Sequence, residues 1–245
     1  MKNSIARSLV ATALAAGLMV TPSLGTTEEP AKAWSVDTAV SFYSDYMFRG
    51  FNLFNGTSIQ PSVYANYETD FGTFTAGAWS HLSADQKSGG DRFTEIDYTL
   101  KYSYSWEPVT IAAGYLWYRY PSDDIVETEE FFATLSYDWD LLNPVVNFYH
   151  DTDAFDNQYY DLTLSHEFSD VLGSETAITP YVNFGFASDA DKVYEDDGLV
   201  VVIAGTSVSY DFGPITVSPN FNYSFKVDDN TVNTFFIGTN LSYSF

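Results

Sequence analysis

Apolar and polar side chains alternate at every second position over most of the chain after residue 35. Between Ile215 and Lys226, apolar residues and Pro219 occupy the odd positions, and polar residues occupy the even ones. Successive side chains of a strand point to opposite faces, so this pattern places the two kinds on opposite faces of an extended segment. The same alternation recurs over 96–106 and 232–245. The sequence therefore predicts an all-β fold.

The segments that fit this pattern number about twelve. We predict strands over 35–46, 57–69, 73–82, 92–106, 108–120, 126–138, 143–151, 156–168, 175–187, 199–211, 214–226 and 232–245. Tight turns at 70–72, 107–108 and 212–214 alternate along the chain with longer polar connections at 51–56, 84–91, 122–126 and 188–198. An even number of strands with short turns at one end and longer loops at the other is typical of outer-membrane barrels. We expect a closed antiparallel up-and-down transmembrane β-barrel in the bacterial outer membrane.

Alternation alone fits a lipocalin-like soluble barrel equally well, because exchanging the two faces leaves the period unchanged. Three features favour a membrane barrel whose apolar outer face contacts lipid. The polar face is mostly Ser, Thr, Asn and Gly with hardly any Lys, whereas strands that face solvent normally carry mixed charges. Aromatic residues stand at the strand ends, as in the aromatic belts of membrane proteins. About twelve strands also enclose more space than side chains fill, since eight strands are only just filled.

The first 25 residues have the layout of a cleaved secretory signal. Lys2 and Arg7 are followed by the apolar stretch 9–20 and the small-residue segment 21–25, which places cleavage near Gly25. A second small-residue site at 31–33 leaves the bond open. The apolar stretch is shorter than the roughly 20 residues a spanning helix needs. We therefore divide the chain into a signal peptide (1–25), a periplasmic segment (26–34) and the transmembrane barrel (35–245).

Charge and cysteine content exclude several classes of function. The chain has 33 acidic and 10 basic residues and a net charge of −23, which argues against nucleic acid as a partner. It has no cysteine, which removes disulfides, thiolate metal sites and cysteine nucleophiles together. The acidic segment 151–157 offers oxygen ligands for a hard cation, but it lacks the EF-hand glycine. We therefore expect solvated extracellular loops, with no metal site and no cofactor.

The last residues, Leu241-Ser242-Tyr243-Ser244-Phe245, resemble the C-terminal signature of outer-membrane barrels. In that class, a final aromatic residue preceded by apolar residues at every second position is read by the barrel insertion machinery. The resemblance implies that this machinery is a partner through Phe245. Membrane lipid, lipopolysaccharide and small solutes are the other expected partners.

The first hairpin carries a more specific pattern. Residues 43–50 read Tyr-Ser-Asp-Tyr-Met-Phe-Arg-Gly, 59–61 read Ile-Gln-Pro, and 74–80 read Phe-Thr-Ala-Gly-Ala-Trp-Ser. These segments, and also 114–121 and 130–137, resemble motifs of the TorF family, a family of bacterial proteins described as porins. The hairpin match covers roughly the first third of the mature chain, and the later half departs into generic barrel strands. The resemblance implies the location and a porin-like class, but no substrate.

If the apolar faces point to lipid, the parity of each strand assigns the charged residues of the lumen. The inward acids Glu95, Asp97, Glu130 and Asp161 outnumber the single mid-barrel lysine, Lys101. Their field should favour cations or neutral polar solutes and oppose anions. Such charges also serve simply to solvate a wet interior or to tie the wall together. We expect Lys101 to pair across strands with an acid.

Arg49 follows the first strand. We expect it to fold inward onto Asp45 or a neighbouring acid, as a structural clamp in preference to a solute contact. Four bulky residues also face inward by parity and predict an aromatic constriction: Tyr64, Trp79, Tyr118 and Phe132.

These patterns favour a narrow channel for passive diffusion of small cationic or neutral solutes. The second hypothesis is a structural or adhesive barrel without transport. An outer-membrane lipid hydrolase is the least favoured, because the three histidines, His81, His150 and His166, form no His-x-Ser pair on one strand face. We predict no enzymatic activity.

Overall fold

The computed structural model describes residues 33–84, 93–121, 126–139, 141–173 and 175–245. The predicted signal peptide and most of segment 26–34 and of the predicted loops 84–91 and 122–126 lie outside these residues. The strands are β1 (Trp34–Phe48), β2 (Phe51–Thr69), β3 (Gly72–Ser83), β4 (Phe93–Trp106), β5 (Val109–Arg119), β6 (Thr128–Tyr137), β7 (Val145–Asp151), β8 (Gln158–Ser165), β9 (Phe168–Ser169), β10 (Thr176–Ser188), β11 (Gly198–Phe212), β12 (Ile215–Lys226) and β13 (Thr234–Ser244). No helix in the described ranges is long and apolar enough to span a membrane.

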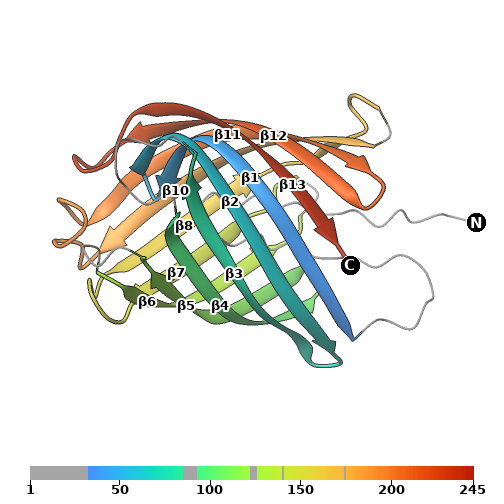
Figure 1. Cartoon of the computed structure of the whole chain (residues 1–245), viewed down its shortest axis with the longest axis horizontal. Coiled ribbons are helices and arrows are strands. Elements are labelled where there is room, and N and C mark those ends of the chain that lie inside the picture. Colours follow the sequence, from blue (N-terminus) through green and yellow to red (C-terminus); the bar gives the residue numbers. More distant parts are fainter. Residues whose placement is uncertain (1–32, 85–92, 122–125, 140, 174) are drawn as a thin grey trace, which may run out of the picture.

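The strands close into one barrel. Each pairs antiparallel with its neighbours, and β1 meets β13, for example at Val40 and Leu241. Segments β8 and β9 both pair with β10 and form one strand interrupted at 166–167, so the barrel that the described residues form has twelve strands. Figure 1 shows them winding obliquely around a common axis, with the C-terminus and the start of β1 at the same end. We call this the short-turn end and the opposite one the long-loop end. The predicted barrel is confirmed.

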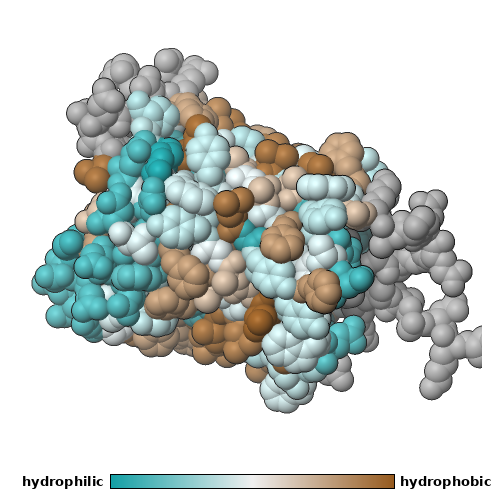
Figure 2. Space-filling model, turned by 90° about the horizontal axis from the view of Figure 1, so that it is seen from below, coloured by the Kyte–Doolittle hydropathy of each residue, from teal (hydrophilic) through white to brown (hydrophobic). Residues whose placement is uncertain are grey.

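Apolar side chains cover the outside of the barrel, and polar ones line its inside. In β12, the outward side chains are exposed and the inward ones are buried: Phe221, Tyr223 and Phe225 against Asn220, Asn222 and Ser224. On the face that Figure 2 shows, hydrophobic residues lie along the wall and hydrophilic ones gather at one end. With the outer wall in lipid, closure pairs the backbone groups of every strand and leaves no open sheet edge. The predicted orientation of the two faces is confirmed.

The first hairpin is longer than predicted. We expected a strand ending at 46 and a loop over 51–56, but β1 runs to Phe48 and β2 begins at Phe51. Only Arg49 and Gly50 form the turn, with φ angles of 46° and 91°. Two residues of positive φ form the tight turn that suits the twist of paired strands. Segment 55–58, Asn-Gly-Thr-Ser, resembles a loop in composition, but the pairing of β2 with β1 holds it as strand.

The distal part of this hairpin leaves the wall. The pairing of β1 with β2 shifts register between Tyr43 and Asp45 and again between Tyr46 and Met47. Such bulges bend a strand and turn its side chains to a different face. Tyr46, which lies between the two shifts, is buried. At the long-loop end, β1 and β2 bend toward the barrel axis (Figure 1).

Candidate functional site: a constriction in the lumen

Arg49, at the tip of the first hairpin, reaches the far wall of the barrel. Its Nη1 and Nη2 donate to Oε1 and Oε2 of Glu130 in β6 at 2.6 and 2.7 Å. In the ring of strands, β7 lies opposite β1, and β6 and β8 flank β7. The Arg49 and Glu130 side chains are only 6% and 5% exposed. The ion pair therefore spans the lumen and is shielded from water.

Aromatic rings surround this ion pair. The Arg49 Cζ atom lies 4.3 Å from the ring centre of Tyr149, 4.6 Å from that of Tyr159 and 4.7 Å from that of Phe48. The hydroxyl of Tyr118 donates to Glu130 Oε2 at 2.6 Å. Guanidinium groups stack favourably on aromatic faces, and bidentate contacts with a carboxylate are the strongest neutralising geometry. We call Tyr118, Glu130, Tyr149 and Tyr159 the guanidinium cage.

Loops at the long-loop end cover the hairpin tip. The hydroxyl of Tyr194 donates to the Arg49 carbonyl at 3.2 Å, and the Val232 N–H donates to the Gly50 carbonyl at 3.0 Å. A Cβ atom at Gly50 would lie 2.8 Å from Thr231 Cγ2 and 3.0 Å from Val201 Cβ. Together with its positive φ, this close approach requires glycine at the tip. The tip is therefore packed in the lumen on several sides.

All four predicted lumen acids are buried inside the barrel, but their surroundings differ. Glu130 is neutralised by Arg49. Asp161 accepts hydrogen bonds from Asn147 Nδ2 at 3.0 Å and Asn183 Nδ2 at 3.1 Å. Glu95 accepts one from the Tyr46 hydroxyl at 2.8 Å.

Asp97 is the least compensated of these acids. It shares one face of β4 with Glu95 and is 2% exposed. Neither of its carboxylate oxygens accepts a hydrogen bond within the described part of the chain. A buried carboxylate without donors is costly, so Asp97 is the least stabilised of the four acids.

The partner of Arg49 differs from the one named in the prediction, and the pairing predicted for Lys101 is wrong. Arg49 folds inward as expected, but its partner is Glu130 and not Asp45. Asp45 instead accepts hydrogen bonds from Ser44 Oγ at 2.8 Å and Asn52 Nδ2 at 3.0 Å. Lys101 forms no ion pair with any acid that the structure describes. Strand parity does not predict the bend of the first hairpin. This bend places Arg49 against Glu130 and away from Asp45.

Of the four predicted constriction residues, two lie along the wall and two contact other residues of the lumen. Tyr64 and Phe132 lie over Gly77 and Gly114 of the adjacent strands, where a Cβ atom would collide with their rings. These two rings therefore lie along the wall. Trp79 packs against Tyr46 with ring centres 5.6 Å apart, and Tyr118 reaches Glu130.

Three aromatic residues of the constriction were not predicted from the sequence: Tyr46, Tyr149 and Tyr159. Tyr149 and Tyr159 have the parity of the inward acids Asp151 and Asp161, so alternation was sufficient to find them. Tyr46 lies beyond the register shift, where alternation gives no indication.

The acidic segment 151–157 organises its own loop. Asp151 Oδ1 accepts backbone N–H groups of Asp153 and Phe155, each at 3.0 Å, and Oδ2 accepts the Thr128 hydroxyl at 2.6 Å. Among the residues that the structure describes, no three His, Asp or Glu side chains are grouped to hold a metal ion.

Further acids stand at the mouth of the long-loop end. Asp228 Oδ2 accepts the backbone N–H groups of Glu195 and Asp196 at 2.9 and 3.1 Å. The nearby charge of Asp229 raises the pKa of Glu195, while the hydrogen bond from Lys226 lowers the pKa of Asp229. The mouth therefore carries a negative field that attracts cations.

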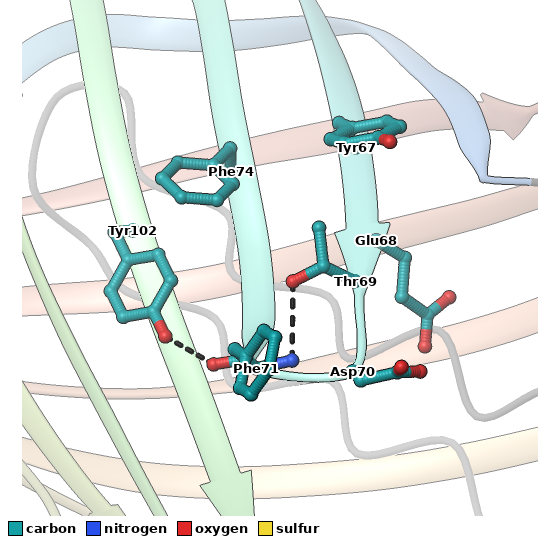
Figure 3. A pocket seen from close by; sticks show the side chains of 7 residues that line it. All are labelled: Tyr67, Glu68, Thr69, Asp70, Phe71, Phe74 and Tyr102. Carbon is teal, nitrogen blue, oxygen red and sulfur yellow. Dashed lines mark hydrogen bonds between the residues drawn. The ribbon is translucent and has the colours of Figure 1, made fainter.

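An open pocket of about 700 Å³ lies at the short-turn end, around the turn between β2 and β3. Figure 3 shows Tyr67, Phe74 and Tyr102 on its wall, with the Phe71 N–H donating to Thr69 Oγ1 at 3.2 Å and the Tyr102 hydroxyl donating to the Phe71 carbonyl. The three rings are exposed and belong to the outer aromatic belt. The hydrogen bonds hold the turn. Because the pocket is lined by exposed residues at the short-turn end, it is separate from the constriction.

No protein-family model and no curated protein matches the sequence. Similar solved structures are an outer membrane channel from Pseudomonas putida F1 (TM-score 0.58, 12% identity, 89% of this chain and 100% of that one), the KdgM porin (0.54, 9%, 86% and 99%) and the NanC porin (0.52, 13%, 86% and 98%). At such low identity the likeness concerns architecture alone. The chain has the fold of outer-membrane channel barrels.

Proposed function

We propose that the protein is a porin-like channel of the bacterial outer membrane that passes small cationic or neutral solutes by passive diffusion. The observation that carries this proposal is a closed barrel with an apolar outer wall and an interior lined by acids and amides. A polar interior enclosed by lipid-facing strands is what an aqueous passage requires. The architecture it shares with solved outer-membrane channels supports the same reading.

The charges of the lumen favour cations. Arg49 balances Glu130, which leaves Glu95, Asp97 and Asp161 as the uncompensated carboxylates near the constriction. A ring of carboxylates in a narrow passage attracts cations and repels anions. The acidic mouth adds to this field at longer range.

The packed hairpin tip limits the size of solutes. It also fits a second function, that of a structural or adhesive barrel without transport. Because the Arg49–Glu130 pair crosses the lumen, any large solute must displace the tip. A permanently seated tip would make the protein a structural or adhesive barrel, whose acidic loops contact lipopolysaccharide through divalent ions. A lipid hydrolase is less favoured, because His81 is buried inside the barrel, away from lipid. The motif at 43–50, which forms the constriction hairpin, supports placing the chain among TorF-like porins.

Neutralising Glu95 and Asp97 is expected to reduce cation preference. We predict that the Glu95→Gln/Asp97→Asn variant shifts the reversal potential toward zero in planar bilayers under a salt gradient, because it removes two wall carboxylates that pair with no cation in the described part of the chain. Glu130 is left intact so that Arg49 keeps its partner. Glu107→Gln/Asp211→Asn, on two exposed residues at the short-turn end, is the control with the same loss of two charges. A reversal potential equal to that of the wild type would remove Glu95 and Asp97 from the mechanism.

Phe245 is proposed as the residue read by the insertion machinery. Its backbone N–H donates to the Val36 carbonyl at 2.9 Å, but its ring is 62% exposed on the outer face. Removing only the ring should therefore leave the barrel stable. We predict that Phe245→Ala lowers the amount of folded protein in cell outer membranes, while purified variant and wild type refold equally in detergent. Equal amounts in cells would contradict this role.

A further inference from the structure

The guanidinium cage is built on the wall opposite to the hairpin that fills it. Glu130 lies on β6, and Tyr118, Tyr149 and Tyr159 lie on β5, β7 and β8, which are consecutive in the ring. Arg49 comes from the turn between β1 and β2 on the other side. The cage and its occupant therefore belong to separate parts of the barrel, as a receptor and a ligand do.

The cage is held in place without Arg49. The Tyr118 hydroxyl orients Glu130, and the ladder pairs Glu130 with Leu116 on one side and Asp151 on the other. Phe132, two residues along on the same face, is fixed over Gly114. Departure of the hairpin tip would leave a preformed carboxylate between aromatic faces.

The chemistry of the cage selects a planar cation. Both Glu130 oxygens lie 2.6 to 2.7 Å from two different guanidinium nitrogens, the parallel geometry that only a fork of N–H donors provides. The rings of Tyr149 and Tyr159 lie within 4.6 Å of the guanidinium carbon. An ammonium ion is a compact, strongly hydrated charge that satisfies neither feature as well.

The fit of Arg49 itself is incomplete. Its Nε is buried without a hydrogen-bond partner in the described part of the chain. A buried donor left unpaired costs free energy, which weakens the hold of the cage on its own hairpin. A free guanidinium is not tied to the hairpin and can turn to satisfy its donors.

Resting on the proposed channel function, we propose that this cage is a binding site for the guanidinium group of permeating solutes, and that Arg49 is a built-in competitor that closes the passage when no solute is bound. A solute that carries a guanidinium displaces Arg49 from Glu130 and frees the tip to leave the lumen. The site thus couples the opening of the passage to one chemical class of cation.

Chemical rescue of an emptied cage tests this proposal. The Arg49→Ala variant, purified as the full barrel in detergent, is heated with and without methylguanidinium, and the folded fraction is followed by heat-modifiable electrophoresis. We expect methylguanidinium to raise the melting temperature of Arg49→Ala by several degrees, because a ligand that binds only the folded state stabilises it. Methylammonium at the same concentration should raise it less. The Arg49→Ala/Glu130→Gln variant, with a neutral cage, should not respond to either ion.

No response of Arg49→Ala, or an equal response of the double variant, would overturn the proposal. If Arg49→Ala does not fold, the refolding yield of Arg49→Gln with and without methylguanidinium replaces the melting curve, with a higher yield expected and an unchanged yield contradicting the site. Because these readouts need no current, they are independent of transport. A thermal response in a barrel without conductance would remove the channel function and leave the binding site standing.

Discussion

Replacing Arg49 by alanine is expected to raise single-channel conductance several-fold and to destabilise the barrel. The guanidinium is the part of the hairpin tip that reaches across the lumen, so its loss removes the bridge between the two walls. It also leaves Glu130 charged, buried and without its cation, a situation that costs about 3–5 kcal/mol. Currents in planar bilayers and unfolding by urea in lipid vesicles measure the two effects.

Matched variants separate these contributions. Arg49→Ala/Glu130→Gln should recover much of the lost stability, because no buried charge is stranded, yet should keep the high conductance. Arg119→Ala removes another arginine that pairs with an acid, Glu129 at 2.8 Å, but at a partly exposed position. Solvent screening makes such pairs weak, so little change is expected. A folded Arg49→Ala barrel with the wild-type conductance would show that the hairpin tip is not the constriction.

The importance of Arg49 follows from contacts that the sequence does not encode locally. Strand alternation predicts which face each residue takes, because it depends only on neighbours along the chain. It therefore placed Glu95, Asp97, Glu130 and Asp161 inside the barrel. The partner of Arg49 depends instead on a bend in the first hairpin and on closure of the barrel, which brings β6 to the hairpin tip. Both are long-range consequences of the fold.

The hairpin also shows where alternation fails. A register shift after Tyr43 moves Tyr46 to the inner face, and nothing in the polarity of 43–48 indicates it. The polar residues of 52–58 are typical of a loop, and only pairing with β1 makes them a strand. Parity predicted four aromatic rings of the lumen, Tyr64, Trp79, Tyr118 and Phe132. It did not predict the direction of the Tyr64 and Phe132 rings, which depends on which strand neighbour is glycine.

The second large effect is expected from a substitution at a glycine that lies beneath an aromatic ring and leaves no room for a side chain. At Gly114, a Cβ atom would meet the carbonyl oxygen of Leu100 on one side and the Phe132 ring on the other. The carbonyl belongs to the ladder between β4 and β5 and has no room to shift. Adding side-chain volume to so tight a site typically costs about 1–3 kcal/mol, and occasionally more.

We expect Gly114→Val to abolish most of the folded barrel, measured as the yield of heat-modifiable monomer after refolding. Ala113→Val, one position away on the exposed outer face, adds the same type of side chain into lipid and should fold as the wild type does. Gly114→Val/Phe132→Ala should recover only part of the yield, because truncating the ring opens space while the Leu100 carbonyl stays. Full folding of Gly114→Val would mean that the Phe132 ring is free to leave the wall. The packing of Phe132 over Gly114 would then not explain the orientation of Glu130, two residues away.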